Sequence, residues 1–320
     1  MKTIKFDKTF GVDAECCLSS PRGRALCAIY RLPEKCDAVA LHPNSNAWCY
    51  HDNINVEFGI RPTRSIDAAV KRIRDGIKLV MDSADHHHAG VVLDDGCRIH
   101  KGDTADKPGW DVSGCNITFS PRNKDGAPVF NDYTTFLNEV GTMMGFHLHF
   151  SSPELKKISA KREVRNFHLR LAHIMSAVIP PITWMFGKSE WCHKRYGGLG
   201  VGNFRVPAYG FESKDPGSSL LCSPLSAEVV MRAASILVDL CLAEVVRGKR
   251  IPLVDHLSQR SVAEVHSIAS SPGSMQNEFY YVWDCLSQAP VSDNPFTDDS
   301  LLKKAEELEH IPDFVKEWEL

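Results

Sequence analysis

"TMMGFHLHFSS", residues 142–152, places two histidines two positions apart in an otherwise apolar run. Side chains of a β-strand point alternately to its two faces, so a strand here would place His147 and His149 on one face and the intervening hydrophobic residues on the other. The hydrophobic face is expected in the core. The histidine face is expected to meet water or a ligand, although a histidine on a sheet often serves only as a structural hydrogen-bonding group.

Three more stretches alternate polar and apolar residues in the same way: "FGVDAECCL" (10–18), "HDNINVEFGI" (51–60), which we interpret as one strand, and "GFESKD" (210–215). An ordinary exposed strand face is rich in Thr, Lys, Ser and Gln, whereas carboxylates, amides and imidazoles are ligands of divalent metal ions and of the phosphates they bind. If one sheet contains all these strands, its polar face is a candidate metal site. The alternating polar residues are Asp13, Glu15, Asn53, Asn55, Glu57, Glu212 and Lys214.

Strands and helices are predicted to intermix along the chain without a regular βαβ alternation. Amphipathic helices are expected over residues 63–83 and 223–247, together with one long helix over 152–179 that Pro180 and Pro181 would end. Because the strands are amphipathic, the pattern favours an α+β fold with an antiparallel sheet, helices on one face and an open polar face. Residues 1–290 are predicted to form this catalytic domain, and residues 291–320 a linker and a C-terminal helix.

The composition describes a globular protein with a sizeable core: 320 residues, 43% hydrophobic and 24% charged, with a net charge of −3. This near-neutral balance gives no electrostatic reason to expect a nucleic-acid partner. The first twenty residues are too charged for a signal peptide, and the longest apolar segment, residues 174–187, is interrupted by prolines, so no membrane partner is expected. Eleven scattered cysteines without a CxxC motif indicate reduced thiols, and we predict a cytoplasmic protein.

The polar residues that the predicted strands would share on one face indicate phosphoryl-transfer chemistry. Its carboxylates with His147 would bind one or two divalent cations, Mg²⁺ or, with the imidazole, Mn²⁺. Arg205 lies seven residues before Glu212 and would neutralise charge on a transferring phosphoryl group. Transfer of the terminal phosphoryl group of ATP to a carboxylate would give an acyl phosphate, from which an amine displaces phosphate to leave an amide.

Residues 10 to 215 resemble the glutamine synthetase-like carboxylate-amine ligases, most closely the phage-type amidoligase group (COOH-NH2 ligase, type 2). The resemblance lies in the order of "GVDAE", "HDNINVEFGI", "GFHLHF" and "GNFRVPAYGFESKD". It implies a sheet curved around ATP and divalent metal ions, small-molecule or peptide carboxylate and amine substrates, and, for a phage-encoded enzyme, the host cytoplasm. In the roles it implies, the metal ligands are Glu15, Glu57, His147 and Glu212; the nucleotide-binding residues are His149, Arg205 and Asn53; the catalytic residues are Arg205, Glu57 and Lys214; and Asp13 is a supporting group.

The chain departs from the family pattern in two places, at Lys214 and in the segment that contains Asn116 and Thr118. Lys214 stands where relatives more often carry an arginine, so the cation lacks the bidentate fork. Asn116 and Thr118 stand where relatives often carry acidic residues, which places the amine site in question.

Several alternatives remain open from the sequence. A phosphotransferase of the same fold would use the same metal ions and cations, and a non-catalytic nucleotide-binding module is suggested by the two departures. In a separate and simpler alternative, the three glutamates are solvated strand residues without a ligand. The histidine pair could instead bind zinc with Cys115 or Cys192, and a cysteine nucleophile is conceivable, although nothing in the sequence places a cysteine beside a base.

Overall fold

The computed structural model describes residues 3–22, 25–52, 54–94, 96–98, 118–119, 128–129, 141–161, 164–187, 203–260, 272–308 and 314–320. Its strands are β1 (Thr9–Ser19), β2 (Ala25–Leu26), β3 (Ala47–Asp52), β4 (Asn55–Ile60), β5 (Gly90–Val92), β6 (Gly96–Arg98), β7 (Thr118–Phe119), β8 (Pro128–Val129), β9 (Gly141–Met143), β10 (Phe146–Ser151), β11 (Phe204–Arg205) and β12 (Phe211–Ser213). Its helices are η1 (Ala28–Tyr30), α1 (Lys35–Leu41), α2 (Ile66–His86), α5 (Pro153–Ser159), α6 (Asn166–Gly187), η2 (Ser218–Cys222), α8 (Pro224–Arg247), α9 (Pro252–Ser258), α11 (Pro272–Ser287), η3 (Pro295–Thr297), α12 (Asp299–Glu307) and α13 (Phe314–Glu317).

Among the described residues, ten strands form one sheet whose main path runs β3-β4-β1-β10-β12-β11-β7-β8, with β2 and β5 pairing to β1. Every pair in this sheet is antiparallel. The eleven-residue strand β1 lies between β4 and β10, so its side chains are central to both faces. The prediction of an α+β fold with an antiparallel sheet is confirmed.

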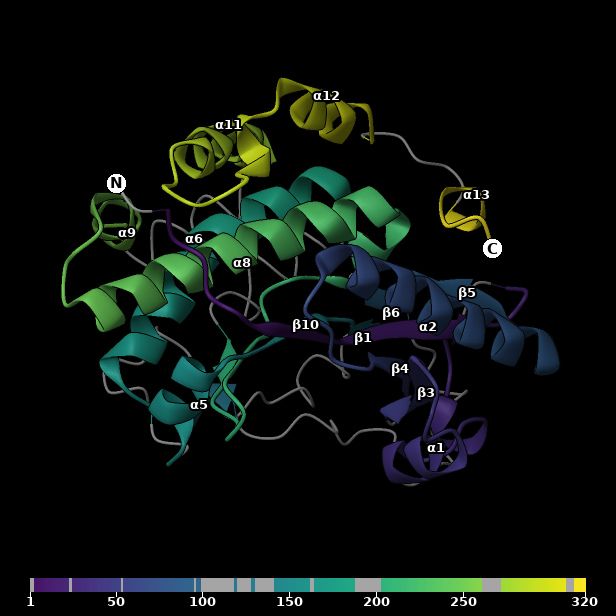
Figure 1. The fold of residues 1–320 in the computed structure, drawn as a ribbon. Coiled ribbons are helices and arrows are strands. Elements are labelled where there is room, and N and C mark those ends of the chain that lie inside the picture. Colours follow the sequence, from purple (N-terminus) through teal and green to yellow (C-terminus); the bar gives the residue numbers. More distant parts are fainter. Residues whose placement is uncertain are drawn as a thin grey trace.

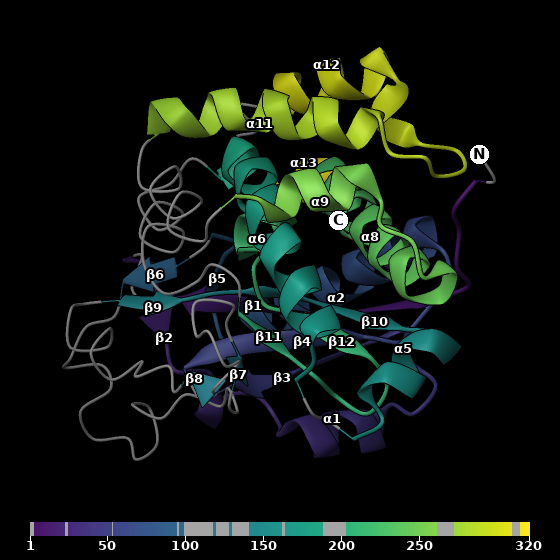
Figure 2. The same cartoon turned by 90° about the vertical axis from the view of Figure 1, so that its left-hand side faces the viewer.

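Helices cover one face of the sheet. Figure 1 shows α2, α6 and α8 lying along one side of β1 and β10, with α11 and α12 forming a further layer beyond α6 and α8; α1 lies on the opposite side, below β3 and β4. The quarter turn in Figure 2 shows the same layers. The covered face is the apolar one: Val12, Phe58, Leu148 and Phe211 are all buried. The other face therefore carries the polar half of each strand.

Local hydrogen bonds and one glycine mark the ends of helices α2 and α8. The Ser65 hydroxyl accepts a hydrogen bond from the backbone N–H of Ala68 at the start of α2. Ser223 and Ser226 form a reciprocal capping box at the start of α8. Gly248 ends α8 with a φ of 62°, a left-handed conformation that glycine adopts without steric cost.

The stretch 51–60 is a hairpin and not the single strand that we predicted. Strand β3 ends at Asp52 and β4 begins at Asn55, and these two residues pair across the turn. Asn53, predicted to bind the nucleotide, lies outside the described residues. The Asp-Asn dipeptide at 52–53 is a common turn signal that the alternation of "NINVEF" obscured.

The predicted long helix over 152–179 is instead two helices, α5 and α6, and the second runs through both prolines to Gly187. Helix α6 is buried from His168 to Phe186 with few interruptions, and packing on all sides offsets the two backbone N–H groups that proline lacks. Its 22 residues are long and apolar enough to cross a membrane, but 83% of its most apolar window is buried inside the fold, as in a core helix.

The C-terminal segment packs back onto the core. Phe296 in η3 and Trp318 just after α13 are each 2% exposed. The Trp318 Nε1–H donates a 2.7 Å hydrogen bond to the carbonyl of Leu221 in η2. The division at residues 290 and 291 into a catalytic domain and a linker with a helix remains a prediction.

Candidate functional site on the polar face of the sheet

Strand register brings the predicted site residues onto one face. Glu15 in β1 lies opposite Glu57 in β4, and Asp13 lies opposite both Gly59 and His147. On the far side of β10, His149 pairs with Glu212, which itself pairs with Arg205. Of the predicted site residues, the structure describes Asp13, Glu15, Glu57, His147, His149, Arg205, Glu212 and Lys214, and they are gathered here.

The densest part of the face is a cluster of three carboxylates. Glu15, Asp52 and Glu57 each offer an oxygen, and these oxygens lie within 4.8 Å of one another. Like charges directly opposite each other on neighbouring strands destabilise a sheet, and Glu15 and Glu57 are placed in just this way. A cation bound between the two carboxylates would be ligated by both and would offset their repulsion. No other group of this kind occurs among the described residues.

Burial and mutual repulsion raise the pKa values of the cluster. Burial, followed by repulsion from Asp52 and Glu57, raises the pKa of Glu15 to about 8. Burial and the charge of Asp13 raise the pKa of Glu57 to about 7. Burial also raises the pKa of Asp52, against the opposing effect of Lys214 and other cations. Desolvation favours the neutral form of a carboxyl group, so proton binding and metal binding would compete at this cluster.

Two neighbours orient the glutamates of the cluster. The backbone N–H of Gly145 donates a 2.7 Å hydrogen bond to Glu15 Oε2. The hydroxyl of Tyr50, on the same face of β3, donates a 2.6 Å hydrogen bond to Glu57 Oε1. Both carboxylates are therefore held in place from the protein side, as supporting groups hold metal ligands.

The second group of charges surrounds Glu212. Its Oε1 lies 3.4 Å from Arg205 Nη1, 3.7 Å from Lys214 Nζ and 3.9 Å from His147 Nδ1. This oxygen is buried and has no hydrogen-bond partner within the described part of the chain. Lys214 is 4% exposed, and its backbone N–H donates a hydrogen bond to the carbonyl of Asn203. The arrangement places cations around a single acceptor oxygen and leaves it without a direct donor.

Asp13 links the two groups. Its Oδ2 lies 3.5 Å from His149 Nε2 and 2.7 Å from Lys35 Nζ. Burial alone would raise the pKa of Asp13, but His149 and Lys35 together hold it below its ordinary value. His149 Nδ1 is 2.5 Å from the hydroxyl of Tyr209, which orients the ring.

Gly59 provides the space that Asp13 occupies. A Cβ atom at this position would lie 2.8 Å from Asp13 Oδ1 and 3.2 Å from the Tyr50 hydroxyl. Any side chain here would push the Asp13 carboxylate off its position opposite strand β4. Glycine at position 59 is therefore needed for the position of the Asp13 carboxylate.

Four residues at the face were not predicted from the sequence: Tyr50, Asp52, Lys35 and Tyr209. The first two belong to β3, and reading "AWCYHD" as a strand ending in a turn would have placed Tyr50 and Asp52 on one face. Lys35 comes from α1 and Tyr209 from the turn between β11 and β12, so only the tertiary fold brings them in.

The chemistry of the donor set fits a hard divalent cation. The close cluster is made only of carboxylate oxygens, which Mg²⁺ and Mn²⁺ prefer, and His147 stands beside the nearby Glu212. A zinc site with Cys115 or Cys192 cannot be placed, because both cysteines lie outside the described residues. Several described cysteines are unsuited to act as nucleophiles, because burial raises the thiol pKa of Cys16, Cys49 and Cys241.

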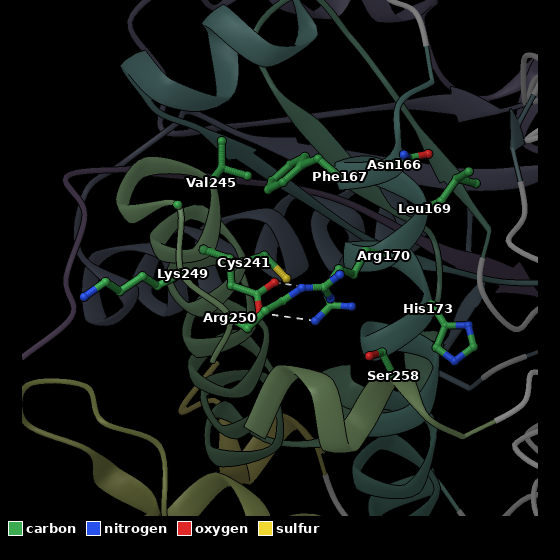
Figure 3. Close-up of a pocket in the computed structure, with 12 residues that line it drawn as sticks. Asn166, Phe167, Leu169, Arg170, His173, Cys241, Val245, Lys249, Arg250 and Ser258 are labelled. Carbon is green, nitrogen blue, oxygen red and sulfur yellow. Dashed lines mark hydrogen bonds and ion pairs between the residues drawn. The ribbon is translucent and has the colours of Figure 1, made fainter. Parts of the chain in front are cut away.

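A separate hollow of about 630 Å³ lies among α6, α8 and α9 (Figure 3). Its lining comes entirely from these helices and the loop between α8 and α9. Arg170 in this hollow is bound to Glu244 at 2.9 Å and to Asp255 at 2.6 Å, so its guanidinium serves to join the helices. The hollow shares no residue with the polar face.

No protein-family model and no curated protein matches this chain significantly. Among solved structures, the chain is similar to a novel glutamine synthase homologue, with 14% identity over 94% of this chain and 70% of that one and a TM-score of 0.38. It is also similar to GmaS in complex with ADP, with 12% identity over 97% of this chain and 72% of that one and a TM-score of 0.44. Similarities at this level do not assign a family.

Proposed function

We propose that the polar face binds ATP and divalent cations and joins a carboxylic acid to an amine, with release of ADP and phosphate. The observation that carries this proposal is the cluster of Glu15, Asp52 and Glu57 on the same sheet face as the cations around Glu212. Phosphoryl transfer needs metal ligands and fixed positive charge side by side, and one surface of the sheet provides both.

The residues divide into two roles. Glu15, Asp52 and Glu57 would hold one divalent cation, and Glu212 with His147 would add a second ligand group. A bound cation neutralises phosphate charge and orients the phosphate oxygens. Arg205 and Lys214 would donate hydrogen bonds to the transferring phosphoryl group, and His149 would contact the nucleotide phosphates.

The proposed reaction has two steps. A carboxylate oxygen of the acid attacks the terminal phosphorus of ATP, the bond from this phosphorus to the bridging oxygen breaks, and ADP leaves with the electron pair. The amine nitrogen then attacks the acyl carbon, the bond to phosphate breaks, and the nitrogen releases a proton as the amide forms. The cations around Glu212 would stabilise the charge that develops in the first step.

The test is ADP formation from magnesium-ATP against a panel of carboxylic acids, each with and without a panel of amines. We expect turnover that requires an acid, with an amide as product when an amine is present. Phosphate transfer to a nitrogen without any acid would identify a phosphotransferase instead. Binding of magnesium-ATP without turnover would indicate a nucleotide-binding module, and failure to bind it would overturn the proposal.

A further inference from the structure

Lys35 places a positive charge among the carboxylates of the site from outside the sheet. It is the first residue of α1, and its Nζ lies 2.7 Å from Asp13 Oδ2 and 3.4 Å from Glu57 Oε1. These two carboxylates belong to neighbouring strands, β1 and β4. The ammonium group therefore bridges two strands at the level where their carboxylates come together.

An aromatic ring and the carboxylates attract the Lys35 ammonium group electrostatically. It lies 4.8 Å from the centre of the Tyr50 ring, over the face of the aromatic system. The Tyr50 hydroxyl and the Lys35 ammonium both contact Glu57 Oε1. Glu57 is thus shared between the three-carboxylate cluster on one side and Lys35 on the other.

The Lys35 side chain reaches the two carboxylates from the solvent side. Its side chain is 55% exposed, whereas those of Asp13 and Glu57 are 21% and 12% exposed. Ala38 is the one buried residue of α1, and Val39 and Leu41 on the same helix are exposed. Few packed side chains therefore surround the lysine, and its position depends mainly on the two ion pairs.

We propose that Lys35 is a tethered counter-ion that occupies a cation position between Asp13 and Glu57 and exchanges there with a divalent metal ion. This inference rests on the proposed function, which assigns the neighbouring carboxylates to metal binding. With Lys35 in place, Asp13 and Glu57 both form ion pairs with its ammonium group, and no metal ion is needed between them to neutralise their charge. With Lys35 withdrawn, the same two carboxylates are available as ligands.

The experiment measures binding of Mn²⁺ alone to the full chain at about pH 8, without nucleotide, by electron paramagnetic resonance of the free ion. Lys35→Met removes the charge and keeps the length of the side chain, Lys35→Arg keeps the charge, and Lys71→Met is a control on the exposed face of α2. We expect Lys35→Met to bind Mn²⁺ about three- to tenfold more tightly, or to bind one more ion, because the competing ion pairs are gone. The other two variants should match the parent.

A further substitution of Asp13→Asn in the Lys35→Met background should abolish the gain, because it removes one of the two carboxylates. Parent-like Mn²⁺ binding by Lys35→Met, with binding still lost in Glu15→Gln, would overturn the role of Lys35 and leave the metal site intact. Absence of Mn²⁺ binding in every variant, with normal thermal unfolding, would overturn the proposed function and this inference together.

Discussion

Glu15 and Glu57 face each other across two hydrogen-bonded strands, with Asp52 beside them. A sheet gains nothing from this opposition unless something positive enters between the side chains. At the scale of single residues, the site is therefore defined by opposed carboxylates whose repulsion a bound cation would offset.

We expect Glu15→Gln and Glu57→Gln to fold and to lose ATP turnover, each by more than the roughly 100-fold loss that is typical when a group supporting a metal ligand is removed. Each substitution keeps the size of the side chain and removes a charged ligand. The measurement is ADP formation at saturating magnesium-ATP, with thermal unfolding as the test of folding. Glu317→Gln, at an exposed position in α13, is the matched control. Near-normal turnover would exclude that glutamate from the metal site.

Arg205→Ala should slow the chemical step by about 10²- to 10³-fold, as expected for a preorganised cation that stabilises a transferring group. Lys214→Arg should retain activity because it restores a guanidinium at this position, and Lys214→Ala should be intermediate. Single-turnover ADP formation with a carboxylate acceptor is the measurement, and Arg64→Ala, at an exposed residue, is the control. If Arg205→Ala reacts as fast as the parent, β11 does not line the active site.

Without metal, stability should fall as pH rises from about 5 to about 8. The pKa of Glu15 is raised from 4.5 to about 8 and that of Glu57 from 4.5 to about 7, so in this range the folded protein binds more protons than the unfolded chain. The free energy of unfolding then decreases as the protons are lost. Added Mn²⁺ should raise the unfolding temperature more at the upper end of the range, because it binds the ionised carboxylates.

The measurement is the thermal unfolding midpoint across this pH range with and without Mn²⁺. Glu57→Gln should flatten the metal-free dependence, because the amide does not titrate. A metal-free midpoint that rises steadily with pH would contradict the assignment of buried, protonated carboxyl groups.

At the scale of elements, the packing of α2 on the apolar face controls the position of β4. A Cβ atom added at Gly76 would lie 2.2 Å from Phe58 Cδ2, and Phe58 is completely buried next to Glu57. We expect Gly76→Ala to destabilise the protein by about 1–3 kcal/mol through overpacking, in spite of the better helix propensity of alanine. Urea unfolding measures this change. Asp75→Ala, one position away on the exposed face, should stay within about 0.5 kcal/mol of the parent.

The elements also show what a single sequence can and cannot predict. Alternation with period two assigned Glu15, His147 and Glu212 to one face correctly, because a strand offers its side chains only two directions. Where a strand turns is set by one or two residues, so merging β3 with β4 concealed Asp52. Lys35 could not be predicted for a different reason. It contacts Asp13, 22 residues away in the sequence, and such a contact leaves no periodic pattern.

Helix α6 illustrates the same limit for helices. Two adjacent prolines normally predict a helix end, and local propensity supported that prediction. Burial on all sides of Pro180 and Pro181 overrides it, and such burial depends on α8 and α11, which lie far along the chain. The helix predicted over residues 223–247 agrees with α8, because the serine at its start and the glycine just past its end are local signals.

At the scale of the whole molecule, the C-terminal end is connected to the site through the core. Trp318 donates to the carbonyl of Leu221 in η2, the Ser218 hydroxyl of the same element donates to the carbonyl of Gly145 at 2.9 Å, and Gly145 donates to Glu15. Residues 291–320 were predicted as a linker and a helix. Because of these contacts, we expect removal of residues 291–320 to disturb the core and the polar face as well.

We expect Trp318→Ala to destabilise the whole chain by about 3–5 kcal/mol, the range found when a buried tryptophan is removed. Unfolding should remain a single transition when followed by circular dichroism and by tryptophan fluorescence. Glu317→Ala, exposed at the neighbouring position, should have almost no effect. Two separate transitions in the parent would instead favour a C-terminal segment that folds independently.

The facing positions of Glu15 and Glu57 have a consequence for experiments that select variants of this protein for heat resistance. In the absence of metal, neutral substitutions at either position relieve repulsion, so heat-resistance screens of a metal-free library should enrich variants that have lost the site. Selection in the presence of Mn²⁺ should reverse this preference, because the carboxylates then contribute to stability through the bound ion. The choice of buffer would thus decide whether directed evolution preserves or discards the activity.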